Sequence, residues 1–154
     1  SSYQNNIKVQ EVCKETAALY KRPLDYRTLL DQFHLSSYTN QFVEKLSGGE
    51  RQKLSIVTAL IPDPQVLFLD ELTTGLDVEA RREVWETLKT LKQQGMTMIL
   101  TTHYMEEAQY LCDRVLLLAH GKMVKEGTVD TIIQDSGKPN LEEAYLYYMK
   151  EESK

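Results

Sequence analysis

The residues best suited to chemistry gather in two short segments of the chain. The first is Leu46-Ser47-Gly48-Gly49-Glu50, in which a hydroxyl and a carboxylate stand three residues apart, the spacing of a capping box at a helix start. A cap alone does not need both glycines, because each costs about 1 kcal/mol relative to alanine inside a helix. Glycines let a ligand approach the backbone closely, and a helix N-terminus favours an anion. The segment therefore predicts a capped helix start or a phosphate contact, and the paired glycines favour the phosphate.

The second segment ends in two adjacent carboxylates. Residues 66–69 form a continuous apolar run, typical of a strand buried on both faces of a parallel sheet, and Asp70 and Glu71 follow directly. Open parallel sheets bind ligands at the carboxyl ends of their strands. One carboxylate there could hold Mg²⁺, and the other could orient or deprotonate an attacking water. The alternative for an isolated Asp-Glu pair is two solvated acids at the start of a loop.

Two further residues stand where the same chemistry would need them. His103 follows an expected strand at 96–101, so we expect it at the same edge of the sheet as Asp70 and Glu71, in a functional role. Asp77 precedes a long amphipathic pattern and is expected to cap that helix.

In order and spacing, these segments resemble the motifs of ATP-binding-cassette (ABC) ATPases. Leu46 to Glu50 is similar to the signature motif, residues 66–71 to the Walker B strand with its catalytic glutamate, and residues 74–77 to the D-loop. His103 resembles the switch histidine. The resemblance runs from about residue 7 to the C-terminus and is greatest to bacterial exporter-type ATPase subunits.

The resemblance implies ATP and Mg²⁺ as cofactors, held head to tail between two nucleotide-binding domains. By this resemblance Asp70 would hold the hydration shell of Mg²⁺, Glu71 would be the general base, and His103 would contact the γ-phosphate. Asp77 of the D-loop would couple the two sites. The nucleotide contacts made in trans would be Ser47, Gly48, Gly49 and Glu50.

The expected fold class is α/β, a partial P-loop NTPase (ABC ATPase) fold with a parallel sheet flanked by helices, plus an N-terminal helical (signature) subdomain. The expected division is 1–61 for that subdomain, 62–135 for the C-terminal half of the ATPase core and 136–154 for a C-terminal helix. Arg51 and Lys53 could serve phosphate binding, but an exposed cationic face is the expected role of each, and His34 is expected in a helix. Helices are expected at 7–20, 26–33, 47–61, 78–94 and 104–112, and strands at 96–101, 114–119 and 122–126. The strand at 114–119 is expected to be buried and to pair with 122–126 in a hairpin that turns at His120 and Gly121.

The buried sides of two helices follow from their apolar periods. They are expected to carry Leu54, Val57, Leu60 and Ile61 in the helix at 47–61, and Val84, Leu88 and Leu91 in the helix at 78–94, which Gly95 should end. Thr128 and Asn140 are expected to cap two last helices.

The sequence contains no segment of the form Gly-x-x-x-x-Gly-Lys-Ser/Thr, which would cradle the β- and γ-phosphates. The chain also begins on Ser1 rather than Met, so we expect the C-terminal part of a longer protein. Without those phosphate donors we expect weak Mg-ATP binding and negligible hydrolysis by this chain alone. Because a sheet cut midway exposes an unpaired edge, we also expect a tendency to self-associate.

Composition limits the remaining functions. The 42% hydrophobic and 27% charged content is that of an ordinary soluble protein, and the net charge of −5 argues against nucleic acid as a partner. Cys13 and Cys112 have no metal-ligand spacing and are expected to be free thiols. The resemblance implies a cytoplasmic protein, peripheral on the inner face of the cell membrane, whose partners are a second nucleotide-binding domain (in a homodimer or heterodimer) and a transmembrane permease subunit. The alternatives are a soluble ABC ATPase acting on ribosomes or DNA, and a non-catalytic interaction fragment.

Overall fold

The computed structural model describes residues 6–151 of the chain. Packing divides the chain into two compact units, Ser1–Ile99 and Leu100–Lys154. The division at 61/62 and 135/136 that the sequence suggested follows motifs rather than packing, and it stays a prediction.

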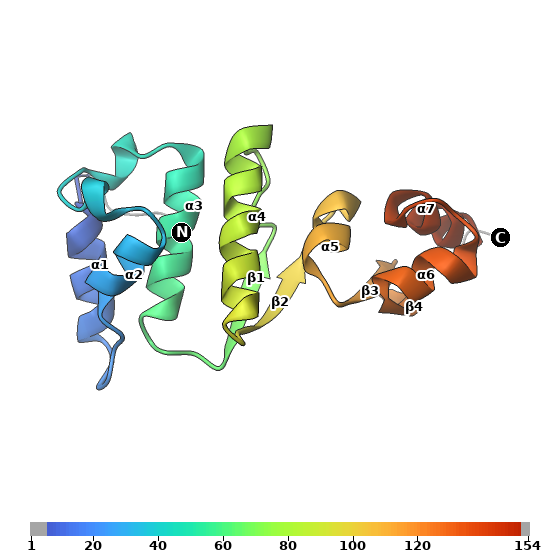
Figure 1. The fold of residues 1–154 in the computed structure, drawn as a ribbon, viewed down its shortest axis with the longest axis horizontal. Helices are drawn as coiled ribbons and strands as arrows, with labels where there is room; N and C mark the ends of the chain where they lie inside the picture. The colour runs from blue at the N-terminus through green and yellow to red at the C-terminus, as the bar shows by residue number, and fades with distance from the viewer. Residues whose placement is uncertain (1–5, 152–154) are drawn as a thin grey trace. The chain divides into compact units, whose positions relative to one another are not determined.

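The first unit begins with a helical layer built around α3 (Gly48–Leu60), which packs against both α1 (Val9–Ala18) and α2 (Tyr26–Gln32) (Figure 1). Two 3₁₀ turns, η1 (Ser36–Tyr38) and η2 (Val43–Lys45), lead from α2 to α3. The buried side chains of α3 include all the apolar residues expected from its 3.6-residue period: Leu54, Val57 and Leu60, followed by Ile61.

Helix α4 (Val78–Gln93) lies alongside α3 and completes the core of this unit (Figure 1). Val84, Leu88 and Leu91 face inward as predicted, and Trp85 joins them with only 1% of its surface exposed. Gly95 follows the helix with φ +91°, a left-handed conformation that glycine adopts without strain, so the helix ends there as expected.

Strands β1 (Val66–Asp70) and β2 (Thr97–Thr101) form a two-stranded sheet, with α4 between them in the sequence. The expectation that β1 is buried on both faces is wrong. Leu67 and Leu69 are buried, whereas Val66 is 38% and Phe68 74% exposed. Because successive side chains of a strand point to opposite faces, one face of β1 packs on the core and the other is open in the described structure.

His34 is not part of a helix, contrary to expectation. It follows α2 with φ +57°, and its N–H donates to the carbonyl of Asp31 while that of Leu35 donates to the carbonyl of Leu30. This is the Schellman arrangement, in which a left-handed residue ends a helix and satisfies its last carbonyl groups.

The second unit packs three helices on a hairpin. Strands β3 (Arg114–Ala119) and β4 (Lys122–Thr128) pair antiparallel, as the sequence predicted. The prediction that β3 is buried is wrong: Leu117 is buried, but Leu116 and Leu118 are each more than half exposed. The helices are α5 (Met105–Leu111), α6 (Val129–Ser136) and α7 (Leu141–Glu151).

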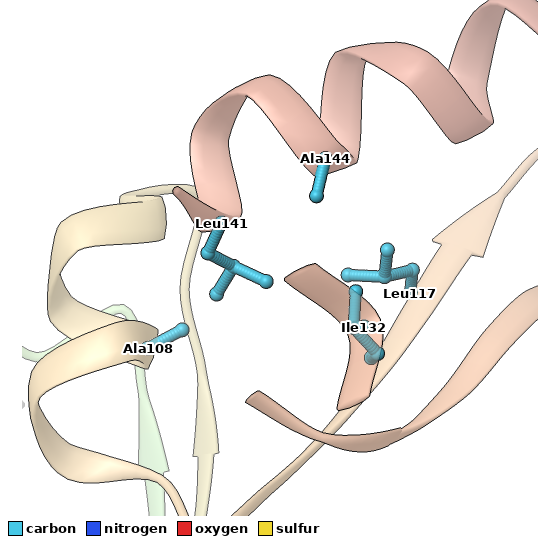
Figure 2. Packing of buried hydrophobic residues seen from close by; sticks show 5 residues of the cluster. All are labelled: Ala108, Leu117, Ile132, Leu141 and Ala144. Atoms are coloured by element: carbon cyan, nitrogen blue, oxygen red, sulfur yellow. The ribbon is translucent and has the colours of Figure 1, made fainter. Parts of the chain in front are cut away.

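The core of the second unit is small and apolar. Figure 2 shows its five buried side chains, contributed by the three helices and β3: Ala108, Leu117, Ile132, Leu141 and Ala144. The predicted caps are confirmed, since Thr128 accepts from the Thr131 N–H at 3.1 Å and Asn140 accepts from the Glu143 N–H at 2.9 Å. Between residues 6 and 151, no helix combines the length and the apolar character required to cross a bilayer.

Candidate functional site

The N-terminus of α3 is closed by the capping box that the sequence predicted. The Ser47 hydroxyl oxygen accepts from the Glu50 N–H at 3.2 Å, and Glu50 Oε2 accepts from the Ser47 N–H at 2.7 Å. The first N–H groups of a helix have no partner within the helix. A serine hydroxyl can both accept and donate, so Ser47 also carries a donor at this helix start.

Packing explains why two glycines follow this cap. A Cβ at Gly48 would lie 2.9 Å from Leu76 Cδ2, and a Cβ at Gly49 would lie 3.1 Å from the Cβ of Ala80. The glycines therefore let the first turn of α3 approach the turn at 73–77 and the start of α4. The sequence had suggested only that they make room for a ligand.

Asp77 sits at the junction between that turn and α4. Its Oδ1 accepts from the Ala80 N–H at 2.9 Å, which confirms the predicted N-cap. The turn itself is closed by a hydrogen bond from the Thr74 N–H to the Glu71 carbonyl and another from the Leu76 N–H to the Thr73 carbonyl, both at 3.2 Å. The first turns of α3 and α4 thus form one packed surface.

The two carboxylates end β1 and enter this turn. Asp70 is the last residue of the strand, and both acids are exposed. Glu71 has φ +45°, which is uncommon for a residue with a side chain and requires stabilisation by the surrounding structure. Left-handed backbone of this kind occurs often at active sites, so the backbone of Glu71 marks it as a candidate functional residue.

His103 belongs to the second unit, whereas Asp70 and Glu71 belong to the first. Its side chain is exposed, and its ring lies 4.2 Å from the ring of Tyr104. The expectation that His103 shares a sheet edge with the two carboxylates stays a prediction.

Two side chains near the start of α3, Tyr38 and Glu83, were not predicted from the sequence, and the exposure predicted for a third, Lys53, was wrong. The Tyr38 hydroxyl donates a hydrogen bond to the Glu50 carboxylate. Lys53, expected on an exposed face, is 9% exposed, and its Nζ lies 2.7 Å from Glu83 Oε2 on α4. Arg51, by contrast, is exposed as expected. Only the spacing of Glu50 and Lys53 on one helix face was visible in the sequence, because Tyr38 and Glu83 are distant along the chain.

Both cysteines are free, as predicted. Burial raises the pKa of the Cys13 thiol to about 12, so this side chain stays protonated and is unsuited to nucleophilic attack or metal binding.

The acids suit Mg²⁺ bound with a nucleotide. In the described part of the chain, no group of three or more His, Cys, Asp or Glu side chains could hold a metal ion by itself. Mg²⁺ rarely uses such a cage, since it keeps several waters and takes one or two carboxylates with substrate phosphates. An exposed Asp70 at the end of β1 fits that donor set.

Comparison with known proteins gives a consistent result. The family described as "ABC transporter" matches residues 1–74. A Nod factor export ATP-binding protein I of Rhizobium johnstonii is 40% identical over 148 residues, which cover 90% of this chain and 48% of the relative. The daunorubicin resistance ATP-binding protein DrrA3 of Streptomyces coeruleorubidus is 41% identical over 114 residues, which cover 74% of this chain and 36% of the relative. The chain therefore spans less than half the length of these curated relatives.

Solved structures agree on the fold. The structure described as the ATP binding subunit of an ABC transporter superposes with a TM-score of 0.77 and 26% identity, over 96% of this chain and 65% of the other. An inward-facing, putative metal-chelate type ABC transporter gives a TM-score of 0.75 at 24% identity, over 86% of this chain and 57% of the other, and supports the fold alone. Over the part that it spans, the chain thus shares the sequence likeness and the fold of ABC transporter ATP-binding proteins.

Proposed function

We propose that the chain is part of the ATP-binding subunit of an ABC exporter, in which ATP binding and hydrolysis drive transport across the membrane. Its relatives include ATP-binding proteins named for Nod factor export and for daunorubicin resistance. The observation that carries the proposal is the contact between the capped start of α3 and the turn at 73–77, which follows Asp70 and Glu71 in the same unit.

In this proposal the start of α3 binds phosphate. The Ser47 hydroxyl and the amides of Gly48 and Gly49 donate to the γ-phosphate of an ATP held by a second nucleotide-binding domain, and Glu50 keeps the turn in shape. Amides at a helix N-terminus suit this task because they point outward and carry the positive end of the dipole.

The acids supply the remaining chemistry. Asp70 holds the waters of Mg²⁺, and Glu71 takes a proton from the attacking water. When bound, Mg²⁺ neutralises part of the phosphate charge. His103 contacts the γ-phosphate, and Asp77, fixed at the start of α4, couples the two ATP sites across the dimer. The left-handed backbone of Glu71, immediately after the strand, supports this assignment, because such conformations are concentrated at functional sites.

The working assembly pairs this domain with a second nucleotide-binding domain and with a transmembrane permease at the cytoplasmic face of the membrane. The phosphate-cradling loop absent from these 154 residues would come from the rest of the protein. The same assignment gives the chain on its own weak ATP affinity and negligible turnover.

Replacement of Glu71 by Gln in the full-length protein tests the central assignment. Without a general base, MgATP should still drive dimerisation in sedimentation velocity, while ATP turnover should fall by about a hundredfold or more. The matched control is Glu15→Gln on α1, an exposed carboxylate outside the site, which should leave both readouts unchanged. Turnover by Glu71→Gln at the wild-type rate would refute the role given to Glu71.

A further inference from the structure

Glu50 places a negative charge at the helix end that the proposed function assigns to a phosphate. Its carboxylate lies in the first turn of α3 and accepts the Ser47 N–H at 2.7 Å. A carboxylate in this turn and a bound phosphate compete for the same positive end of the helix. Phosphate binding therefore requires that the charge of Glu50 be offset.

The surroundings of Glu50 keep it ionised. Desolvation raises its pKa, but the Ser47 N–H, the Tyr38 hydroxyl, the Ser47 hydroxyl and the charge of Lys53 lower it, and the net pKa is below the ordinary value. The hydrogen bond to Glu50 raises the pKa of the Tyr38 hydroxyl, which consequently keeps its proton and remains the donor. Tyr38 thus orients the carboxylate without neutralising it.

Lys53 is the cation whose charge acts on Glu50. It stands three residues after Glu50 on α3, and Glu50, Lys53 and Glu83 line the same groove. The Lys53 side chain is 11% exposed, and Glu83, with 56% of its side chain exposed, holds the ammonium at 2.7 Å. A charge withdrawn from water in this way is screened less than a surface charge and acts more strongly on its neighbours.

We propose that Lys53 is a positioning residue for phosphate capture: Glu83 of α4 fixes its ammonium beside Glu50, where it offsets the carboxylate and lets the amides of Gly48 and Gly49 receive a γ-phosphate. The inference rests on the proposed function and adds a residue pair to it. It also gives α4 a direct influence on the nucleotide contact at the start of α3.

The test is a double-mutant cycle in full-length protein that carries Glu71→Gln, so that MgATP binding is read as dimerisation without turnover. Lys53→Met should raise the MgATP concentration for half-maximal dimerisation about tenfold, while Lys53→Arg should stay within about twofold of the parent. Glu50→Gln keeps the capping box, since Gln serves at this position as Glu does. In that background, Lys53→Met should change the midpoint by less than about twofold.

Glu83→Gln is the second variant, because Glu83 is half exposed and Gln keeps an oxygen that can accept from the Lys53 ammonium. It should raise the midpoint about threefold in the parent and not in the Glu50→Gln background. Equal effects in both backgrounds, accompanied by a lower melting temperature, would show a purely structural ion pair and overturn the inference. A parent that dimerises with MgATP but does not respond to these variants overturns the inference alone, whereas a parent that fails to dimerise overturns the proposed function and the inference together.

Discussion

Leu76 packs so closely on Gly48 that a Cβ at position 48 would lie 2.9 Å from Leu76 Cδ2. The contact joins the first residue of α3 to the residue before Asp77. A change at Gly48 is therefore transmitted to the turn at 73–77.

Gly48→Ala should destabilise the first unit by about 1 kcal/mol, because the added methyl group must displace Leu76 from its packed position. The flexible end of Leu76 can move, so the effect should be moderate. Gly49→Ala should be worse, since Ala80 presents Cβ at 3.1 Å and its backbone Cα at 3.6 Å, and neither can rotate away. Urea unfolding of the two variants gives the comparison.

The double variant Gly48→Ala with Leu76→Ala is the control for this mechanism. Removal of the isobutyl group creates the space that the new methyl needs, so the two changes should be non-additive and the pair less damaging than their sum. Additive losses would show that the methyl group at position 48 does not act through its contact with Leu76.

The depressed pKa of Glu50 predicts a specific dependence of stability on pH. A carboxyl group whose pKa is lower in the folded protein stabilises the fold above its unfolded pKa, about 4.3, and this contribution disappears as the pH falls through the folded value. Wild type should therefore exceed Glu50→Gln in free energy of unfolding at pH 7, and the difference should shrink on acidification below about pH 4. The other carboxylates are the same in the two proteins, so their contribution cancels in the difference in free energy of unfolding. A difference that stays constant from pH 7 to pH 3 would contradict the prediction.

The features predicted correctly from the sequence depend on neighbours along the chain. Ser47, Asp77, Thr128 and Asn140 were expected as caps from residue type and spacing, and all four accept a backbone N–H three residues ahead. The hairpin around His120 was equally local. Such features can be predicted from the sequence because caps and turns form within one turn of a helix or a few residues of a strand end.

The features that were missed depend on residues distant in sequence. Lys53 and Glu83 are 30 positions apart, so nothing local indicated that the lysine is buried. The apolar run at 66–69 is compatible with burial of both faces of β1, but the face that is covered depends on the elements that pack on the strand. For the same reason, the sequence linked the glycines at 48 and 49 to a ligand but not to Leu76 and Ala80.

The core of the second unit predicts a large effect from one substitution. Ile132 is fully buried among the five residues of Figure 2, so Ile132→Ala removes three carbon atoms and leaves a cavity. The expected loss is about 2–5 kcal/mol, whereas Ile132→Val should lose about 0.5–1.5 kcal/mol. Because the core is small, thermal unfolding followed by circular dichroism should show both effects. An Ile132→Ala protein as stable as Ile132→Val would mean that the site collapses around the deletion.

A final prediction separates a complementing module from an inert piece. Residues 1–154 carry the capped start of α3 and the acids of β1 but no phosphate-cradling loop, so the chain alone should show negligible ATP turnover. Mixing it with a separately produced N-terminal part of the full-length protein should restore measurable turnover, because one polypeptide then supplies the phosphate donors and the other the general base. The same mixture made with the Glu71→Gln chain should remain inactive, which excludes a contaminating ATPase. Turnover by residues 1–154 alone that approached the rate of the full-length protein would show that the missing loop is dispensable and would overturn the division of labour proposed for the two parts.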